Sequence, residues 1–199
     1  MSADKETLAV YGTMADHYRT LVSNDGADAS LLDFLDTLPD GARILDLGCG
    51  PGNAAAAMIA RGYDVLAVDA APEMVALARD VYGVPAQVQT FDDLEAVDAF
   101  DGVWANFSLL HAERAELPTH LAALHRALRP GGRLHLGMKT GRGAARDTLG
   151  RLYTYYSETE LAALLVAARY TVVSTRTGIT RGMAGTDDPF VIFAAERNG

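Results

Sequence analysis

Two carboxylates and a run of alternating glycines stand where a small ligand could be held. Asp46 precedes Gly48, Gly50 and Gly52, and Asp69 follows further along the chain. Glycine adopts backbone dihedrals closed to residues with a Cβ and lets the backbone approach a ligand. Asp46 interrupts an apolar run, where a carboxylate is costly unless it is bonded. We expect it to contact a ligand ammonium, and the alternative is a buried aspartate that caps the turn.

The elements around these residues form a strand, a tight turn and a helix. We expect a strand at 43–47, a helix at 53–61 behind the glycines, and a second strand at 64–68 that ends at Asp69. Adjacent parallel strands end at the same edge of a sheet, where an acid accepts hydrogen bonds from ribose hydroxyls. Ribose binding is therefore predicted for Asp69, and the alternative is a cap on the helix that begins near Pro72.

Alternating strands and helices continue along the chain. We expect helices at 5–22, 29–38, 73–82, 113–128 and 157–168, strands at 86–90, 100–105, 133–138, 170–177 and 190–196, and loops at 139–150 and 178–189. This order predicts an α/β fold: a doubly wound, mostly parallel seven-stranded sheet with helices on both faces and an antiparallel C-terminal hairpin. We expect a single domain over 1–199, with a helical cap at 1–40, a cofactor-binding core at 41–138 and a substrate-side region at 139–199. The 178–188 loop is a candidate mobile flap.

Composition excludes several classes of partner. The formal net charge of −9 disfavours nucleic acid, whose binding needs a basic face. Cys49 is the only cysteine, so no intramolecular disulfide forms and a cytoplasmic location is expected. The chain shows neither a signal-peptide pattern nor an apolar run long enough to cross a bilayer. The histidines lack metal-ligand spacing, so no metal site is expected, and no base stands beside Cys49 to activate its thiol.

Several short segments together carry a resemblance. The turn reads G-x-G-x-G, unlike the G-x-G-x-x-G of dinucleotide dehydrogenases. The relevant segments are DLGCGPG at 46–52, VD at 68–69, PEM at 72–74, TFDDL at 90–94, FDGVW at 100–104 and LRPGG at 128–132. In this order they resemble the class I S-adenosylmethionine-dependent methyltransferases, small-molecule type. The resemblance implies S-adenosyl-L-methionine as cofactor, S-adenosyl-L-homocysteine as product, and direct methyl transfer to a small-molecule acceptor.

The resemblance also implies roles for individual residues. Asp46 would hold the amino group of the cofactor, and Asp69 would bind its ribose hydroxyls. The backbone at the three glycines would pass close to the methionine part and the ribose of the cofactor. The full set of expected cofactor contacts is Tyr11, Tyr18, Asp46, Gly48, Cys49, Gly50, Gly52, Asn53, Asp69, Ala70, Met74, Thr90, Phe91, Asp92, Asn106 and Phe107. The first two lie on the N-terminal helix and would close over the ligand; the alternative is an amphipathic helix that buries its aromatic stripe.

The acceptor side offers fewer signals. His111 follows the fourth strand and is the candidate general base, with a packing or capping residue as the even alternative. Cations and phenols gather after the fifth strand, at positions 139, 142, 146, 151, 153, 155 and 156. These side chains could bind an anionic or aromatic acceptor. The alternative is a solvated loop whose tyrosines pack on the sheet. Two other functions stay open: a nicotinamide-dependent reductase, and a non-catalytic cofactor-binding protein on the same fold.

Overall fold

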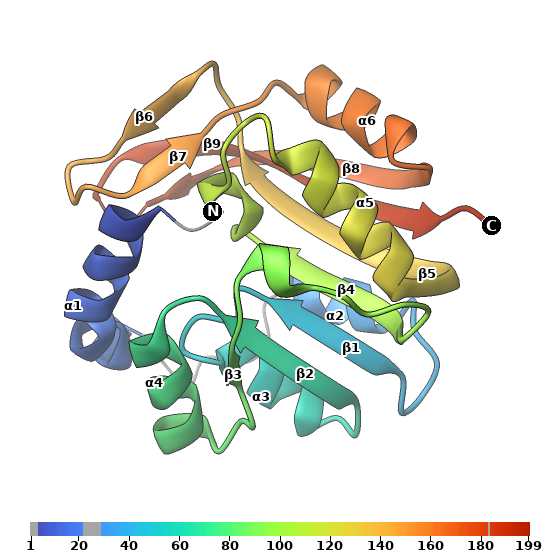
Figure 1. The fold of residues 1–199 in the computed structure, drawn as a ribbon, viewed down its shortest axis with the longest axis horizontal. Coiled ribbons are helices and arrows are strands. Elements are labelled where there is room, and N and C mark those ends of the chain that lie inside the picture. The colour runs from blue at the N-terminus through green and yellow to red at the C-terminus, as the bar shows by residue number, and fades with distance from the viewer. Residues whose placement is uncertain (1–3, 22–28, 183) are drawn as a thin grey trace.

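The computed structural model describes residues 4–21, 29–182 and 184–199, and only the backbone of 15–21 (Figure 1). Within these residues seven strands form one sheet in the order β3-β2-β1-β4-β5-β9-β8. Their bounds are β1 Arg43–Leu47, β2 Asp64–Asp69, β3 Gln87–Val88, β4 Phe100–Asn106, β5 Leu128–Lys139, β8 Tyr170–Arg181 and β9 Asp187–Arg197. The first five run parallel, and β9 pairs antiparallel with both β5 and β8. The predicted sheet and its C-terminal hairpin are confirmed.

Helices cover both faces of this sheet (Figure 1). They are α1 Lys5–Leu21, α2 Ala29–Leu35, α3 Asn53–Ile59, α4 Pro72–Tyr82, α5 Leu117–Ala127 and α6 Glu158–Ala167, with short 3-10 turns η1 Phe91–Asp93 and η2 Leu109–His111. Successive residues of a strand face opposite sides. Thus Leu45 and Val103 join the core under α5 and α6, whereas Ile44 and Trp104 join the core under α2, α3 and α4. None of the described helices is both long and apolar enough to span a bilayer.

The C-terminal hairpin is longer than the sequence suggested. The loop expected at 178–189 is wrong, because the β8–β9 ladder continues to Arg181 opposite Asp187. Gly178 falls in that expected loop, but it lies opposite Phe190 in the ladder, and a Cβ there would meet the Phe190 ring at 2.7 Å. The glycine therefore makes room for a cross-strand aromatic ring, so the expected flap is a paired ribbon whose turn lies near Gly182.

The segment after β5 is also more ordered than expected. Strands β6 Ala144–Arg146 and β7 Leu152–Thr154 pair antiparallel, and β6 lies in the stretch expected to be a loop. Helix α5 begins four residues later than expected, with Pro118 in its first turn, where the missing N–H is harmless. Helix α6 begins with the expected capping box between Ser157 and Glu160.

Candidate functional site

The glycine elbow links β1 to α3 through three left-handed residues. Gly48, Gly50 and Gly52 have φ of 73°, 54° and 89°. A Cβ on Gly48 would lie 2.4 Å from the Ser108 Cβ, and one on Gly52 would lie 2.7 Å from the Ala78 Cβ. A Cβ on Gly50 would meet no described heavy atom within 4 Å. The outer glycines therefore allow close packing, and the middle one faces open space.

Asp69 ties the end of β2 to this elbow. Its Oδ2 accepts from the Gly50 N–H at 2.9 Å, and its Oδ1 accepts from the Ala71 N–H at 2.8 Å. Burial raises the pKa of Asp69, and the backbone hydrogen bonds oppose that effect. A carboxylate has about four acceptor positions, so both oxygens can still accept from ligand hydroxyls.

Asp46 lies beneath the elbow, 2% exposed. Its pKa is raised to about 7, mainly by burial and also by the nearby Asp69, while a hydrogen bond from the Ala55 backbone opposes the rise. Its Oδ2 is buried without a hydrogen-bond partner among the described residues. A buried acceptor of this kind suits a cationic or protonated group.

The adjoining turn after β3 is held by its own side chains. The Thr90 N–H and hydroxyl both donate to the Asp93 carboxylate, at 2.8 and 2.7 Å. Asp93 is thus engaged in a capping box around η1. Phe91 packs edge-on against His120 with ring centroids 5.4 Å apart. Asp92 has its Oδ1 4.0 Å from the His120 Nδ1.

The end of β4 carries a constrained pair. Asn106 Oδ1 lies 3.0 Å from His135 Nε2. Because an amide oxygen only accepts, the histidine carries its proton there, and Asn106 has its amide N–H groups to offer a ligand. Phe107 follows with φ of 56°, an uncommon value for a bulky residue, and packs edge-on against Phe190. Such backbone strain is found at functional sites.

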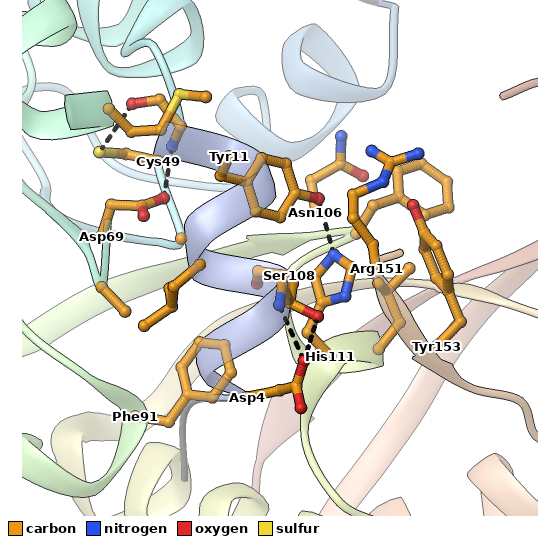
Figure 2. A pocket seen from close by; sticks show the side chains of 18 of the residues that line it. Asp4, Tyr11, Cys49, Asp69, Phe91, Asn106, Ser108, His111, Arg151 and Tyr153 are labelled. Atoms are coloured by element: carbon orange, nitrogen blue, oxygen red, sulfur yellow. Dashed lines mark hydrogen bonds between the residues drawn. The ribbon is translucent and has the colours of Figure 1, made fainter. Parts of the chain in front are cut away.

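Helix α1 reaches the site through a hydrogen-bonded histidine, as Figure 2 shows. His111 Nδ1 lies 2.6 Å from the Leu152 carbonyl oxygen, and its Nε2 lies 2.7 Å from the Tyr11 hydroxyl. The carbonyl can only accept, so Nδ1 carries the proton and Nε2 accepts from Tyr11. Burial lowers the pKa of His111 to about 4, and burial raises that of Tyr11. Both groups are therefore neutral near pH 7.

The same helix is docked at its beginning onto the β6–β7 hairpin. Both Arg146 terminal nitrogens donate to Asp4, each at 2.9 Å, and Asp4 also accepts from the Thr7 N–H at 2.8 Å. The Leu152 N–H donates to the Thr7 hydroxyl at 2.8 Å. Leu8 packs on the small cluster formed by α4. Helix α1 thus bridges α4 and the hairpin.

These elements enclose a cavity of about 390 Å³, a volume typical of small-molecule sites. Most residues named from the sequence line it: Tyr11, Gly48, Cys49, Gly50, Asn53, Asp69, Ala70, Met74, Thr90, Phe91, Asn106, Phe107 and His111. Asp46, Gly52 and Asp92 are outside its lining, and the Tyr18 side chain lies outside the described residues. Burial raises the Cys49 pKa, with Asp46 and Asp69 adding to it, so its thiol stays protonated.

The sequence marks the remaining cavity-lining residues as site residues only weakly or not at all. Lys139, Arg151 and Tyr153 were among the cations and phenols noted after the fifth strand, but Arg142 and Arg146 do not line the cavity. Sequence reasoning missed Asp4, Thr7, Leu8, Pro51, Gln89, Ser108, Leu110, Arg181 and Gly182. Asp4 stands three residues before Thr7, an N-cap spacing that could have marked the start of α1.

Comparison with known proteins agrees with this geometry. Residues 44–132, which contain the elbow and Asp69, match a family model described as a methyltransferase domain. The chain is 39% identical over 105 residues to a ubiquinone biosynthesis O-methyltransferase of Xanthomonas oryzae pv. oryzae, covering 48% of this chain and 42% of that protein. It is 34% identical over 138 residues to a malonyl-[acyl-carrier protein] O-methyltransferase of Enterobacter lignolyticus, covering 65% of this chain and 52% of that protein. The chain spans about half the length of these curated relatives.

Similarity to a solved structure covers the whole chain. A crystal structure of the Burkholderia thailandensis 1,6-didemethyltoxoflavin-N1-methyltransferase, with bound 1,6-didemethyltoxoflavin and S-adenosylhomocysteine, superposes with a TM-score of 0.77. The two sequences are 28% identical, covering 100% of this chain and 92% of that chain. Residues 44–132 therefore match a methyltransferase domain, and the chain as a whole has the fold of a solved methyltransferase that binds S-adenosylhomocysteine.

Proposed function

We propose that this protein transfers a methyl group from S-adenosylmethionine to a small-molecule acceptor. The observation that carries the proposal is the Gly50–Asp69 hydrogen bond of 2.9 Å, because both partners line one cavity. It fixes the elbow against the end of β2, so both contribute to one wall of the cavity. Open space over Gly50 leaves room for a ligand against the backbone.

The residues fit this cofactor on two independent grounds. The unpartnered Asp46 Oδ2 suits an ammonium group, reached directly or through water. Asp69 has acceptor positions left for two ribose hydroxyls. In this proposal Ala70 and Met74 flank the adenine, and the Thr90–Phe91 segment lies at its edge. When bound, the cofactor supplies an activated methyl on a sulfonium, so the protein mainly positions the acceptor.

The chain's own groups orient the acceptor and exclude water. Helix α1 and the β6–β7 hairpin cover the cavity, which supports a small acceptor over a macromolecular one. His111 stays the predicted general base, but its Nε2 can take a proton only through the Tyr11 hydroxyl or after that hydroxyl leaves. A cytoplasmic location is part of the proposal and is supported by Cys49, a buried thiol with no second cysteine in the sequence.

Calorimetric titration tests the cofactor assignment. We expect the protein to bind S-adenosylhomocysteine and not NADH. Asp69→Ala and Gly50→Val should each abolish binding while thermal unfolding stays cooperative. Asp80→Asn, a change on the exposed side of α4, is the matched control and should bind like the parent. Preference for NADH, or unchanged affinity in folded Asp69→Ala, would contradict the proposal.

A methyl-transfer assay then tests activity. Protein, S-adenosylmethionine and a panel of small acceptors should produce S-adenosylhomocysteine only with some panel members. Tight cofactor binding combined with no turnover on any of them would favour the non-catalytic alternative.

A further inference from the structure

The end of β4 presents two polar side chains to the cavity. Asn106 and Ser108 both belong to its lining, on either side of Phe107. Ser108 is 6% exposed, and its Oγ has no hydrogen-bond partner among the described residues. The Asn106 side chain makes one hydrogen bond in the described part of the chain, to His135. Both side chains therefore have hydrogen-bonding capacity left for a ligand.

These two side chains lie on the β4 side of the elbow. A Cβ on the first glycine of the elbow would meet the Ser108 Cβ at 2.4 Å, so Ser108 packs directly on that turn. In the β1–β4 ladder Asp46 lies opposite Trp104, two residues before Asn106. Asp69 lies on the other side of the elbow, because the strand order is β2-β1-β4. A ligand whose ribose is bound by Asp69 therefore extends over the elbow towards Asp46 and the end of β4.

Asn106 is held in one orientation by its neighbours on β5. Its Oδ1 lies 3.0 Å from His135 Nε2, and a Cβ on Gly137 would meet the same oxygen at 2.6 Å. The glycine thus leaves space for the amide. The Phe107 N–H donates to the Gly137 carbonyl at 3.0 Å, which fixes the backbone beside the amide. Because Oδ1 is turned to His135, the Nδ2 N–H groups are the part of Asn106 left for the cavity.

His135 is itself rigid and neutral. It is 3% exposed, and its ring stacks on Trp104 with centroids 3.7 Å apart and meets Phe34 edge-on at 6.2 Å. Its pKa is lowered to about 3, mainly by burial and also by the nearby Arg176. A neutral imidazole carries one proton, and an amide oxygen requires that proton on Nε2. His135 does not line the cavity, so it can act on a ligand only through Asn106.

The polar groups around the elbow complement an α-amino acid group. The unpartnered Oδ2 of Asp46 is an acceptor and suits an ammonium group. The N–H groups of Asn106 are donors and suit a carboxylate, since hydrogen bonds to charged groups are the stronger ones. The Ser108 hydroxyl can donate or accept and so can serve either group. An acceptor and fixed donors on neighbouring strands therefore match the two charged groups of one amino acid.

We propose that His135 is a positioning residue for the cofactor: it fixes the Asn106 amide so that its N–H groups receive the carboxylate of the amino-acid end. This inference rests on the proposed binding of S-adenosylmethionine. Asp46 then binds the ammonium group, and Asp69 binds the ribose. His135 thereby makes the site selective for a cofactor with an amino-acid group over a nucleoside that lacks one. The selectivity comes from preorganisation, because an unrestrained amide would lose rotamer freedom on binding.

Two probes separate the ends of the cofactor. S-adenosylhomocysteine carries the amino-acid group, whereas 5′-methylthioadenosine has the same adenosine and thioether without it. Calorimetry on the full chain measures both dissociation constants, and their ratio is the selectivity for the amino-acid group. We expect the parent protein to bind S-adenosylhomocysteine at least about tenfold more tightly than 5′-methylthioadenosine, because hydrogen bonds to two charged groups are added.

Two substitutions at position 135 separate the hydrogen-bond donor from the ring. His135→Phe keeps a ring beside Trp104 but cannot donate to Asn106, whereas His135→Gln keeps an N–H donor without the ring. His135→Phe should lower the selectivity about three- to tenfold, the cost of ordering one side chain, and leave the affinity for 5′-methylthioadenosine unchanged. His135→Gln should keep the selectivity of the parent even though its unfolding temperature falls. The matched control is His125→Phe, the same change on α5 at a histidine outside the cavity lining.

Two further measurements test the orientation of the Asn106 amide. Asn106→Asp keeps an oxygen for His135 but replaces the N–H groups with a second oxygen, so S-adenosylhomocysteine should bind at least about tenfold more weakly. NMR of the labelled imidazole nitrogens in the parent protein should find His135 protonated on Nε2 and not on Nδ1 at neutral pH. Neither measurement depends on whether a His135 variant folds, which thermal unfolding checks separately.

Each of several results would overturn the inference. In His135→Phe these are equal losses for both probes, which would assign His135 to the general shape of the site, or no loss of selectivity. An equal loss of selectivity in His135→Gln or His125→Phe would show that the donor to Asn106 is not the cause. Parent-like binding of S-adenosylhomocysteine to Asn106→Asp, or a His135 proton on Nδ1, would contradict the orientation of the amide. Failure of the parent protein to bind either probe is a separate result, which contradicts the proposed function itself.

Discussion

Replacing Asp46 with asparagine should stabilise the unliganded protein near neutral pH. The carboxyl group is buried, and its pKa of about 7 lies well above the ordinary aspartate value of 3.8. Between these two pH values the unfolded chain has lost a proton that the folded chain keeps. The contribution of Asp46 to stability is therefore greatest below about pH 4 and falls as the pH rises towards 7.

The magnitude follows from that difference. Each pKa unit corresponds to about 1.4 kcal/mol, so ionising Asp46 in the folded state removes at most about 4 kcal/mol above pH 7. Asparagine cannot ionise, but its amide places N–H donors where Oδ2 lacks a partner, at a cost of about 1–2 kcal/mol. The expected net gain for Asp46→Asn is about 2 kcal/mol at about pH 8, shrinking to zero or a loss at about pH 4.

Guanidinium denaturation across this pH range, without ligand, measures the effect. Asp80→Asn, which changes an exposed acid, should follow the parent at every pH. A parallel pH dependence in Asp46→Asn and the parent would refute the reasoning about burial.

Asp46→Asn should act on the cofactor in the opposite direction. A neutral amide cannot pair with an ammonium, and a hydrogen bond to a charged group contributes about 1.5–3 kcal/mol. S-adenosylhomocysteine should therefore bind at least about tenfold more weakly to Asp46→Asn. A more stable protein with weaker binding is the signature of a group retained for its ligand.

Three further predictions concern the elbow and the α1 contact. Gly48→Ala should cost about 2–4 kcal/mol of unfolding free energy, because its Cβ meets Ser108. Gly50→Ala should cost only about 1 kcal/mol but block the binding of S-adenosylhomocysteine, because its Cβ would project into open space. Denaturation measures the first effect and calorimetry the second, on both variants. Tyr11→Phe should cost about 1–2 kcal/mol in denaturation because it leaves the buried Nε2 of His111 unpartnered, and an unchanged stability would contradict the Tyr11–His111 contact. His111 contributes stability that is present above the unfolded pKa and lost as pH falls through about 4, so its ring signals in an NMR titration should move near pH 4 and not near 6.5.

Short sequence patterns predict much of the site around the elbow. Alternating glycines, an acid before them and an acid closing the next strand are features of short segments, and their consequences follow from backbone sterics and from strand order. The Gly50–Asp69 contact is therefore within reach of sequence reasoning, because β1 and β2 must be neighbours once the alternation of strands and helices is recognised.

The same local reasoning misread glycines whose partners are distant. Gly178 has the local signal of a loop residue, but it makes room for Phe190 across the hairpin, a contact that exists only after β8 and β9 pair. Gly52 was grouped with the ligand-facing glycines, whereas its missing Cβ admits Ala78 of α4. Whether a glycine serves a ligand or packing depends on what lies above it, and the sequence does not show this.

The sequence by itself determined the sheet, the elbow, the two carboxylates beside it and the resemblance to methyltransferases, because periodicity, turn chemistry and motif order act over short distances. Only the tertiary structure decided what covers the cavity. Tyr11 meets His111 across 100 residues of chain, Asp4 meets Arg146 across 142, and Arg181 joins the cavity lining from the end of β8. Such contacts depend on the packing of every element in between, so the residues that cover the cavity became visible only when the chain was folded.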